Sequence, residues 1–383
     1  MALPGPSIDL KRVPWRQLGP AIVTSAAIPI LAVLTSLAVG LVIIWLSGAD
    51  PILAYSGLWD GAFGNPKYFS ETLVATVPYI FAGLAVGVGF KCGLFNIGAE
   101  GQLYMGALLA VWVGYGLHGL PPYFHLPLAL LAGCLGGAIW GAIPGFLKAR
   151  TGAHEVINTI MMNYIAAKLV DYLVKNPMRD PTSSVQRTPF VEASAQLPQL
   201  LAPHRIHWGL IIALAAAFFV YWLLWKTTIG FEIRTVGANP QAARYAGMSI
   251  GRNFIIAMGF AGLLAGLGGA CEVLGLNHNL PAAFSTGYGF DSIAIALLAK
   301  SHPIGIIPAA FLFGALRNGA SLMQLRSGIP IDLIGIVQGL VIIFVAADQI
   351  IRWLYRIRVK GEKVALPGFS KSWGETEATE GGR

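Results

Sequence analysis

FKCGLFNIGAEGQ, residues 90–102, interrupts two long apolar runs, and the rest of the chain is organised around it. The stretch combines four polar side chains with three glycines: Lys91, Asn96, Glu100, Gln102, Gly93, Gly98 and Gly101. Glycine weakens a helix and allows backbones to approach closely. At membrane depth, non-helical backbone occurs only where protein buries it or where it lines a watery cavity. The stretch therefore predicts part of a solute pathway, although a short turn outside the membrane fits the same spacing.

The composition indicates an integral membrane protein. Of the 383 residues, 55% are hydrophobic and 11% are charged, whereas a soluble domain averages roughly 25% charged residues. The formal net charge of +8 does not indicate nucleic-acid binding, because the basic residues are spread among loops without interleaved aromatics. The three cysteines, Cys92, Cys134 and Cys271, lie far apart with neither zinc-ligand nor disulfide spacing, so we expect them to serve in packing.

Apolar runs and turn signals predict an all-α membrane protein with about ten transmembrane helices. A cytoplasmic tail covers residues 1–19, a transmembrane domain covers 20–354, and a disordered cytoplasmic tail covers 355–383. The expected helices span about 20–46, 71–90, 99–117, 126–147, 156–174, 208–225, 254–276, 291–299, 304–323 and 333–354, and Arg317-Asn318 is expected to interrupt the ninth. Residues 47–70 and 226–253 are expected to be polar loops, and 176–207 a longer loop that suits a lid or a docking surface.

Ten spans place both termini on the same side of the membrane. With that side as the cytoplasm, 18 of the 26 Lys and Arg residues fall inside, in agreement with the positive-inside rule. Residues 145–152 show weak sequence similarity to residues 314–328, and the two stretches lie in helix pairs that turn on opposite sides of the membrane. This similarity predicts two inverted five-helix halves, or it arises by chance between glycine-rich helices.

Motifs for chemistry on nucleotides or peptides are missing from the sequence. No GxxxxGK[ST] string occurs, so an ATP-driven process needs an ATPase on another chain. His154-Glu155 begins a metalloprotease-like HExxH string, but Asn158 takes the place of the second histidine. No nucleophile-and-base set is recognisable. We therefore expect no catalytic residue, no metal site and no cofactor in this chain.

The loop between the sixth and seventh expected helices contains a short helix of its own. Asn239-Pro240 is a turn signal that can precede a helix, residues 241–246 (QAARYA) favour helix, and Gly247 can end it. A short helix outside the bilayer, held between two spans, gives a soluble partner a surface to push against.

Four strings in the chain resemble one protein family. QAAxxxG at 241–247 is similar to the EAAxxxG signature of bacterial ABC importer permeases, with Gln241 in place of the glutamate. GLFNIGAEGQ at 93–102, HEVINTIMMNYIA at 154–166 and FDSIAIALLAK at 290–300 look like the permease family of importers for simple sugars, nucleosides and branched-chain amino acids. The resemblance covers about residues 45–350 and is nearest to the longer-chain nucleoside-type permeases.

The resemblance implies a ten-helix subunit in a bacterial plasma (inner) membrane, surrounded by lipid and without a nucleic-acid partner. It implies three protein partners: an ABC ATPase that binds ATP and Mg, a second homologous permease in a heterodimer, and an extracytoplasmic solute-binding lipoprotein or periplasmic protein. In this family the helix that carries the EAAxxxG signature docks on the ATPase. The matching positions here are Gln241, Ala242, Ala243 and Gly247.

Six residues are candidates for lining the solute pathway: Phe95, Asn96, Glu100, Asn158, Phe290 and Asp291. The polar pair Asn96 and Glu100 can hydrogen-bond hydroxyls or base edges, or else a neighbouring backbone. Both phenylalanines can stack on a sugar or base, but they also suit packing. Asp291 sits where it can cap a helix, and Asn158, like Asn163, suits helix–helix hydrogen bonds as well as solute contact.

We expect the permease subunit of an ATP-driven importer that takes up nucleosides or related simple sugars. The alternative is a stand-alone secondary transporter driven by an ion gradient. It would need a buried coupling carboxylate, for which Glu100, Glu272 and Asp291 are the candidates. A membrane enzyme is a third alternative and would need a catalytic carboxylate or histidine.

Overall fold

The computed structural model describes residues 15–282, 284, 287–330 and seven positions between 333 and 344, with side chains from residue 30 onward. In this part of the chain the regular structure is helical, and β-pairing is limited to isolated bridges. The α-helices are α1 (Trp15–Leu46), α2 (Pro51–Phe63), α3 (Pro66–Lys91), α4 (Ala99–Gly116), α5 (Pro122–Thr151), α6 (Glu155–Lys175), α7 (Gly209–Lys226), α8 (Thr228–Ala238), α9 (Pro240–Tyr245), α10 (Ile250–Glu272), α11 (Tyr288–Leu298) and α12 (Pro303–Ser327). A 3-10 turn, η2 (Ala193–Ala195), and a π-helical turn, η3 (Val273–Asn277), complete the set.

Five helices of the described chain are long and apolar enough to cross a membrane. They are α3, α5, α7, α10 together with η3, and α12, and the segments Ile30–Leu46 and Tyr288–Leu298 are shorter apolar helices. The most apolar window of α3 is 83% buried, compared with 28% for those of α5 and α7. Therefore α3 is a central helix, while α5 and α7 present apolar surface to the surroundings. The last expected span, 333–354, lies largely outside the described residues.

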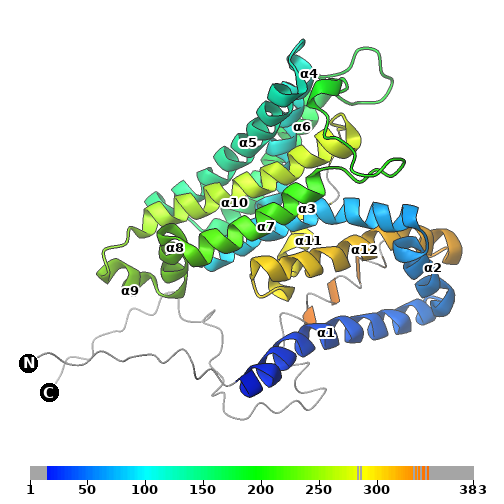
Figure 1. The fold of residues 1–383 in the computed structure, drawn as a ribbon, viewed down its shortest axis with the longest axis horizontal. Helices are drawn as coiled ribbons and strands as arrows, with labels where there is room; N and C mark the ends of the chain where they lie inside the picture. The colour runs from blue at the N-terminus through cyan, green and yellow to red at the C-terminus, as the bar shows by residue number, and fades with distance from the viewer. Residues whose placement is uncertain are drawn as a thin grey trace, which may run out of the picture.

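The helix α10 forms the centre of the bundle and packs against α3, α4 and α5. Along one side of the molecule, α5, α10 and α7 run side by side (Figure 1). Glycines bring α5 and α10 into direct backbone contact, because a Cβ on Gly262 would lie 2.1 Å from the Gly137 carbonyl oxygen. A Cβ on Gly266 would similarly lie 2.4 Å from the Gly133 carbonyl oxygen. Such small-residue contacts are typical of helices that associate in lipid.

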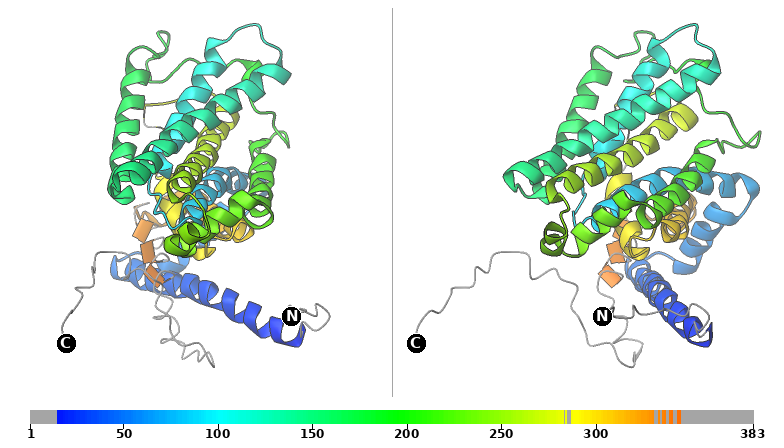
Figure 2. Two further views of the ribbon diagram at one scale, coloured as in Figure 1. Left: turned by 90° about the vertical axis from the view of Figure 1, so that its left-hand side faces the viewer. Right: turned by 60° about the vertical axis from the view of Figure 1, so that its left-hand side comes forward.

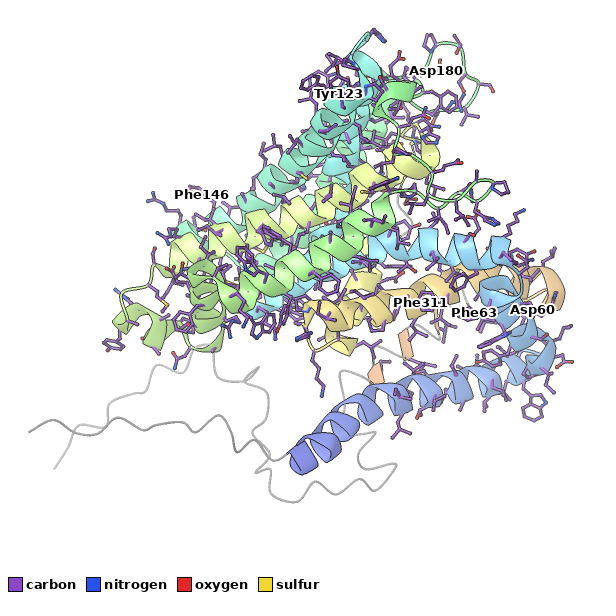
Figure 3. All side chains as sticks on the ribbon, viewed as in Figure 1. Asp60, Phe63, Tyr123, Phe146, Asp180 and Phe311 are labelled. Atoms are coloured by element: carbon purple, nitrogen blue, oxygen red, sulfur yellow. The ribbon has the colours of Figure 1, made fainter. Side chains whose placement is uncertain are left out.

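The helices α1 and α2 lie on the side of the molecule opposite α5 (Figure 2). The helix α2 contacts α1, α3 and α12. Ile44 of α1 shares a hydrophobic cluster with Ala54 of α2 and Met323 of α12. Near the end of α2, Phe63 faces Phe311 of α12 with ring centroids 6.0 Å apart (Figure 3). Beside them, Asp60 accepts a hydrogen bond of 2.6 Å from Arg326. These contacts attach α2 firmly to α12.

Two Asx–Pro pairs that were expected to mark a loop at 47–70 instead begin helices. Asp50 accepts hydrogen bonds from the N–H groups of Ile52 and Leu53 and starts α2. Asn65 accepts one from Tyr68 and starts α3, five residues earlier than expected. In both cases the side chain caps the helix and the following proline occupies its first position, where a missing N–H has no cost. The same arrangement at Asn239 starts α9, as predicted.

Two further differences concern α8 and α12. Residues 228–238 form α8 instead of a loop, because the Thr227 hydroxyl caps the N–H of Gly230. The helix α12 continues through residues 317–318, where an interruption was expected. The Asn318 side-chain amide reaches across to α2 and α3, where it donates to the Gly61 carbonyl at 2.9 Å. A polar side chain inside an apolar helix is accommodated here by a partner on another helix.

Candidate functional site

The backbone break between α3 and α4 satisfies its polar groups within the protein. The side-chain amides of Asn96 and Gln102 exchange two hydrogen bonds of 3.1 Å. Asn96 also accepts a hydrogen bond from the Gly98 N–H. Asn96 is fully buried and Gln102 is 1% exposed. Since a buried amide without partners is costly, this pair stabilises the break and has little hydrogen-bonding capacity left for a solute.

Asn163 of α6 attaches the break to a second helix. Its side-chain oxygen accepts a hydrogen bond of 2.8 Å from the Gly101 N–H, and its nitrogen donates to the Ile97 carbonyl at 2.9 Å. A Cβ on Gly101 would lie 3.0 Å from the Asn163 Cα, so only glycine permits this approach without a shift. Asn163 is therefore bonded to protein, which is one of the two alternatives its position allowed.

Glu100 joins the start of α4 to the start of α11. Its carboxylate accepts a hydrogen bond of 2.6 Å from the Gly289 N–H. The backbones also touch, because a Cβ on Gly289 would lie 2.2 Å from the Glu100 nitrogen. A carboxylate at a helix N-terminus satisfies a free N–H and is favoured by the helix dipole. Two segments almost 190 residues apart in sequence thus meet inside the bundle.

A charged cluster continues this contact toward α3 and α12. Asp291 of α11 accepts a hydrogen bond of 2.7 Å from the Tyr79 hydroxyl. The guanidinium of Arg317 donates to the same hydroxyl at 3.2 Å and lies 3.8 Å from the Asp291 carboxylate. It also lies over the Tyr288 ring, 4.6 Å from its centroid. Asp291 therefore pairs with a cation and a tyrosine, in addition to standing in the first turn of α11.

The charged cluster contains residues that sequence reasoning did not select. Tyr79, Tyr288 and Arg317 were not proposed as site residues, although an arginine within an apolar run is a signal of function. Glu272, at the end of α10, is 6% exposed and interacts electrostatically with Arg317. Arginine, carboxylates and tyrosine rings together provide both hydrogen-bonding and stacking groups for a polar solute.

The remaining predicted pathway residues have different surroundings. Phe290 is 46% exposed, so it remains available for contact beyond this chain. Phe95 instead packs on Phe90, with ring centroids 4.8 Å apart. The Asn158 side-chain nitrogen is buried and has no hydrogen-bond partner among the described residues. The structure thus brings Glu100 to the start of α11, which carries Phe290 and Asp291, whereas Phe95 packs on α3.

The long loop 176–207 covers the segment that leads from η3 toward α11. The Val191 N–H donates to the His278 carbonyl at 2.8 Å, and the Leu197 N–H donates to the Leu274 carbonyl at 2.9 Å. Under this cover, His207 is 1% exposed and accepts a hydrogen bond from the Gly209 N–H. Burial, and secondarily His278, lowers the pKa of His207 from its usual 6.5 to about 4. The imidazole is therefore neutral at physiological pH.

A second surface lies at the opposite end of the bundle, around α8 and α9. Gln241, Ala242 and Gly247 are exposed, whereas Ala243 is buried and holds α9 against the protein. Gly247 has a φ of +82°, which suits glycine at a helix end. Beside α9, a cleft of about 360 Å³ is lined by Thr228, Phe231, Glu232, Ala246, Gly247, Met248, Ser249 and Arg252. Three of the four predicted coupling positions thus lie on α9, and the fourth, Gly247, follows the helix and lines the cleft.

The helix α8 connects this surface to the break after α3. A Cβ on Gly237 would lie 2.2 Å from the Lys91 carbonyl oxygen and 2.8 Å from the Gly93 nitrogen. Cys92 donates from its thiol to the Asn253 carbonyl on α10 at 3.7 Å. A displacement of α8 must therefore displace the break, because no side chain lies between the two backbones.

Within the described residues, no group of three or more His, Cys, Asp or Glu side chains is arranged to hold a metal ion.

Comparison with known proteins gives consistent relatives. A family described as "Branched-chain amino acid transport system / permease component" matches residues 68–346. The chain is 43% identical to the guanosine ABC transporter permease protein NupP of Bacillus subtilis, over 87% of this chain and 97% of that protein. It is 38% identical to the glucose ABC transporter permease protein TsgB13 of Haloferax volcanii, over 86% and 89%. It is 36% identical to the nucleoside ABC transporter permease protein NupB of Lactococcus lactis, over 85% and 91%. No solved structure matches the chain.

Proposed function

We infer a function on the premise that this chain belongs to the family of branched-chain amino acid transport permease components. It is a multi-pass membrane protein and the permease of an ABC transporter. We propose that it takes up nucleosides, with related simple sugars as the neighbouring class. The support for this solute class is that relatives covering most of the chain are named for guanosine, nucleosides and glucose.

The contact between α8 and the break after α3 carries the mechanistic part of the proposal. A partner that pushes on α9 moves α8, and Gly237 transmits this movement directly to the backbone at Lys91 and Gly93. The break then bears on α11 through Glu100 and Gly289. A continuous set of packed groups with two arrangements is the physical requirement for such coupling. The exposed positions Gln241, Ala242 and Gly247 are therefore proposed to contact an ATPase subunit, with the buried Ala243 supporting them.

The remaining parts of the assembly are proposed from the family. An ABC ATPase binds ATP and Mg, a second homologous permease completes a heterodimer, and an extracytoplasmic lipoprotein or periplasmic protein delivers the solute. This chain would have ten spans in two inverted halves and both termini in the cytoplasm of a bacterial cell. Phe95, Asn96, Glu100, Asn158, Phe290 and Asp291 remain the proposed pathway residues. The pathway would run beside Glu100 and Asp291, where the broken segments meet.

Uptake by the reconstituted transporter tests this proposal. Proteoliposomes with all partner subunits should accumulate radiolabelled guanosine only when ATP is supplied. Gly237→Val should abolish uptake while ATP hydrolysis continues, because a side chain there separates α8 from the break. Gly259→Ala is the matched control, since its Cβ would meet its nearest neighbour at an ordinary 3.7 Å. Uptake that follows a proton or sodium gradient and persists without the ATPase would establish a secondary transporter instead.

A further inference from the structure

One group of basic and aromatic side chains lies where three membrane-crossing helices end or begin at the same level of the molecule. The helix α3 ends at Lys91, α7 ends at Lys226, and α12 begins at Pro303. The group at this level, called the basic–aromatic cluster below, consists of Lys91, Tyr221, Trp225, Arg234, Lys300 and His302. Because its members come from the ends of spans, the cluster lies where a bilayer has its polar headgroups.

The Trp225 ring organises the cluster. The Lys91 ammonium lies 5.8 Å from its centroid, and the Arg234 guanidinium lies 5.5 Å from it. The Tyr221 ring stacks on Trp225 at 5.3 Å, and the His302 ring lies 5.2 Å from it. Two cations therefore share one aromatic ring, which brings like charges close together.

The cations of the cluster have no carboxylate partner among the described residues. Among the described residues, the Lys91 ammonium donates to the Lys300 carbonyl alone, at 3.4 Å, and Arg234 uses its Nε to donate to the Leu224 carbonyl at 2.9 Å. Glu232, the carboxylate nearest in sequence, instead accepts hydrogen bonds from Arg252 and Asn253. Neighbouring like charges repel one another, so an anion at this position would be bound favourably.

A strip of exposed aromatic side chains on α7 leads from the bilayer to the cluster. Phe218 is 59% exposed and Trp222 is 52% exposed. With Trp225 they follow the i, i+4, i+7 spacing of one helix face. The surface that meets acyl chains is therefore continuous with the cationic group at its end. A soluble anion would make no use of this apolar strip, whereas a lipid would use both parts.

We propose that the basic–aromatic cluster is a binding site for an anionic phospholipid. The phosphate lies between Lys91, Arg234 and His302, and the acyl chains follow α7 past Trp222 and Phe218. Basic pockets between membrane helices bind anionic headgroups in this way, and tryptophan and tyrosine belong at the same depth. Because Lys91 and Arg234 also contact the break and α8, bound lipid would hold these two elements together.

Native mass spectrometry of the full-length chain in detergent tests the site. Phosphatidylglycerol should bind more tightly than phosphatidylcholine. The double variant Lys91→Gln/Arg234→Gln should bind phosphatidylglycerol roughly 25-fold more weakly, since each cation near a membrane surface contributes about fivefold. Lys67→Gln is the matched control, because Lys67 stands exposed at the opposite end of the same helix and should have no effect. Added phosphatidylglycerol should also raise the thermal unfolding temperature of the unmodified chain, which needs no variant.

Three results would overturn the proposal. The first is equal affinity of phosphatidylglycerol for the double variant and the unmodified chain. The second is inorganic phosphate that competes with the lipid at equal concentration, which would indicate a site for a free anion. The third is a double variant that binds lipid normally but no longer retains the ATPase subunit, which would make the cluster a protein-docking surface.

Discussion

The break after α3 and the segment that leads from η3 toward α11 are held in different ways. The break after α3, residues 92–98, is closed by neutral amides, with Asn96, Gln102 and Asn163 exchanging hydrogen bonds among themselves and the backbone. The segment that leads from η3 toward α11 is held by backbone hydrogen bonds from the loop 176–207, and α11 itself by the Asp291–Arg317 pair.

This difference identifies the part of the molecule that is suited to move. Neutral hydrogen bonds within the first break preserve its shape when α8 displaces it. The contacts at α11 depend on a charge pair and on the loop 176–207, both of which can respond to solute, a docked partner or pH. We therefore expect the first break to move as a rigid body and α11 to act as the gate.

The largest effect is expected from Arg317→Leu. Arg317 and Asp291 are half-buried, so removing the cation leaves the Asp291 carboxylate poorly solvated and should lower the free energy of unfolding by about 3 kcal/mol. Replacing both, in Arg317→Leu/Asp291→Leu, should recover much of this loss. Chemical denaturation in detergent measures both variants. If the double variant is no more stable than Arg317→Leu, the pair does not hold α11.

The second-largest effect is expected from acidification, which should loosen the loop 176–207. The pKa of His207 in the folded protein, about 4, lies below the usual 6.5, so the unfolded state binds the proton first. The stabilisation is complete above pH 6.5 and is lost as the pH falls toward 4, by up to about 3 kcal/mol. Hydrogen exchange at the amides of Val191 and Leu197 should accelerate over this range. His207→Gln should reduce that pH dependence, and burial of His278, which lowers its pKa too, accounts for what remains. Exchange at Gly101 should not change in either protein.

Asn163→Ala should have an intermediate effect on the first break. It leaves the Gly101 N–H and the Ile97 carbonyl buried without a partner, which costs about 2 kcal/mol. Asn158→Ala, five residues earlier on the same helix, removes no hydrogen bond among the described residues and should change stability by less than about 0.5 kcal/mol. Thermal unfolding of the two variants compares them directly. Equal losses would show that the first break is not held by Asn163.

The smallest change in stability is expected at Phe290. Its exposed side chain loses little packing, so Phe290→Ala should shift the free energy of unfolding by less than about 0.5 kcal/mol. Phe95→Ala removes the contact with Phe90 and should cost about 1 kcal/mol beyond lost area. Uptake assays then separate roles: reduced uptake by Phe290→Ala at unchanged stability supports a place in the pathway. Unchanged uptake removes Phe290 from the set of pathway residues.

Local signals in the sequence predicted a large part of this architecture. Long apolar runs located the membrane-crossing helices, and Asn239-Pro240 with Gly247 located α9. The glycines and polar residues of 93–102 located the break, because such a composition cannot form an ordinary apolar helix. The family resemblance, stated from four strings, is confirmed by the family match and the relatives.

What was missed depends on contacts between distant segments. Asp50-Pro51 reads equally well as a turn or as a helix start, and α2 exists because it packs on α12. The interruption expected at Arg317-Asn318 does not occur, because both side chains find partners on other helices. The Arg317 partner Tyr79 is 238 residues away in sequence, and Asp291 stands on the preceding helix, α11. The ten-span topology and the inverted halves remain predictions.

The backbone contact between α5 and α10 has a mechanical consequence. Side chains that separate two helices can change rotamer and let the helices slide past one another. Gly137 and Gly262 leave no such layer, so the two helices cannot slide past one another. Any rocking of the molecule must therefore carry both helices as one body and bend the chain at the loops on either side.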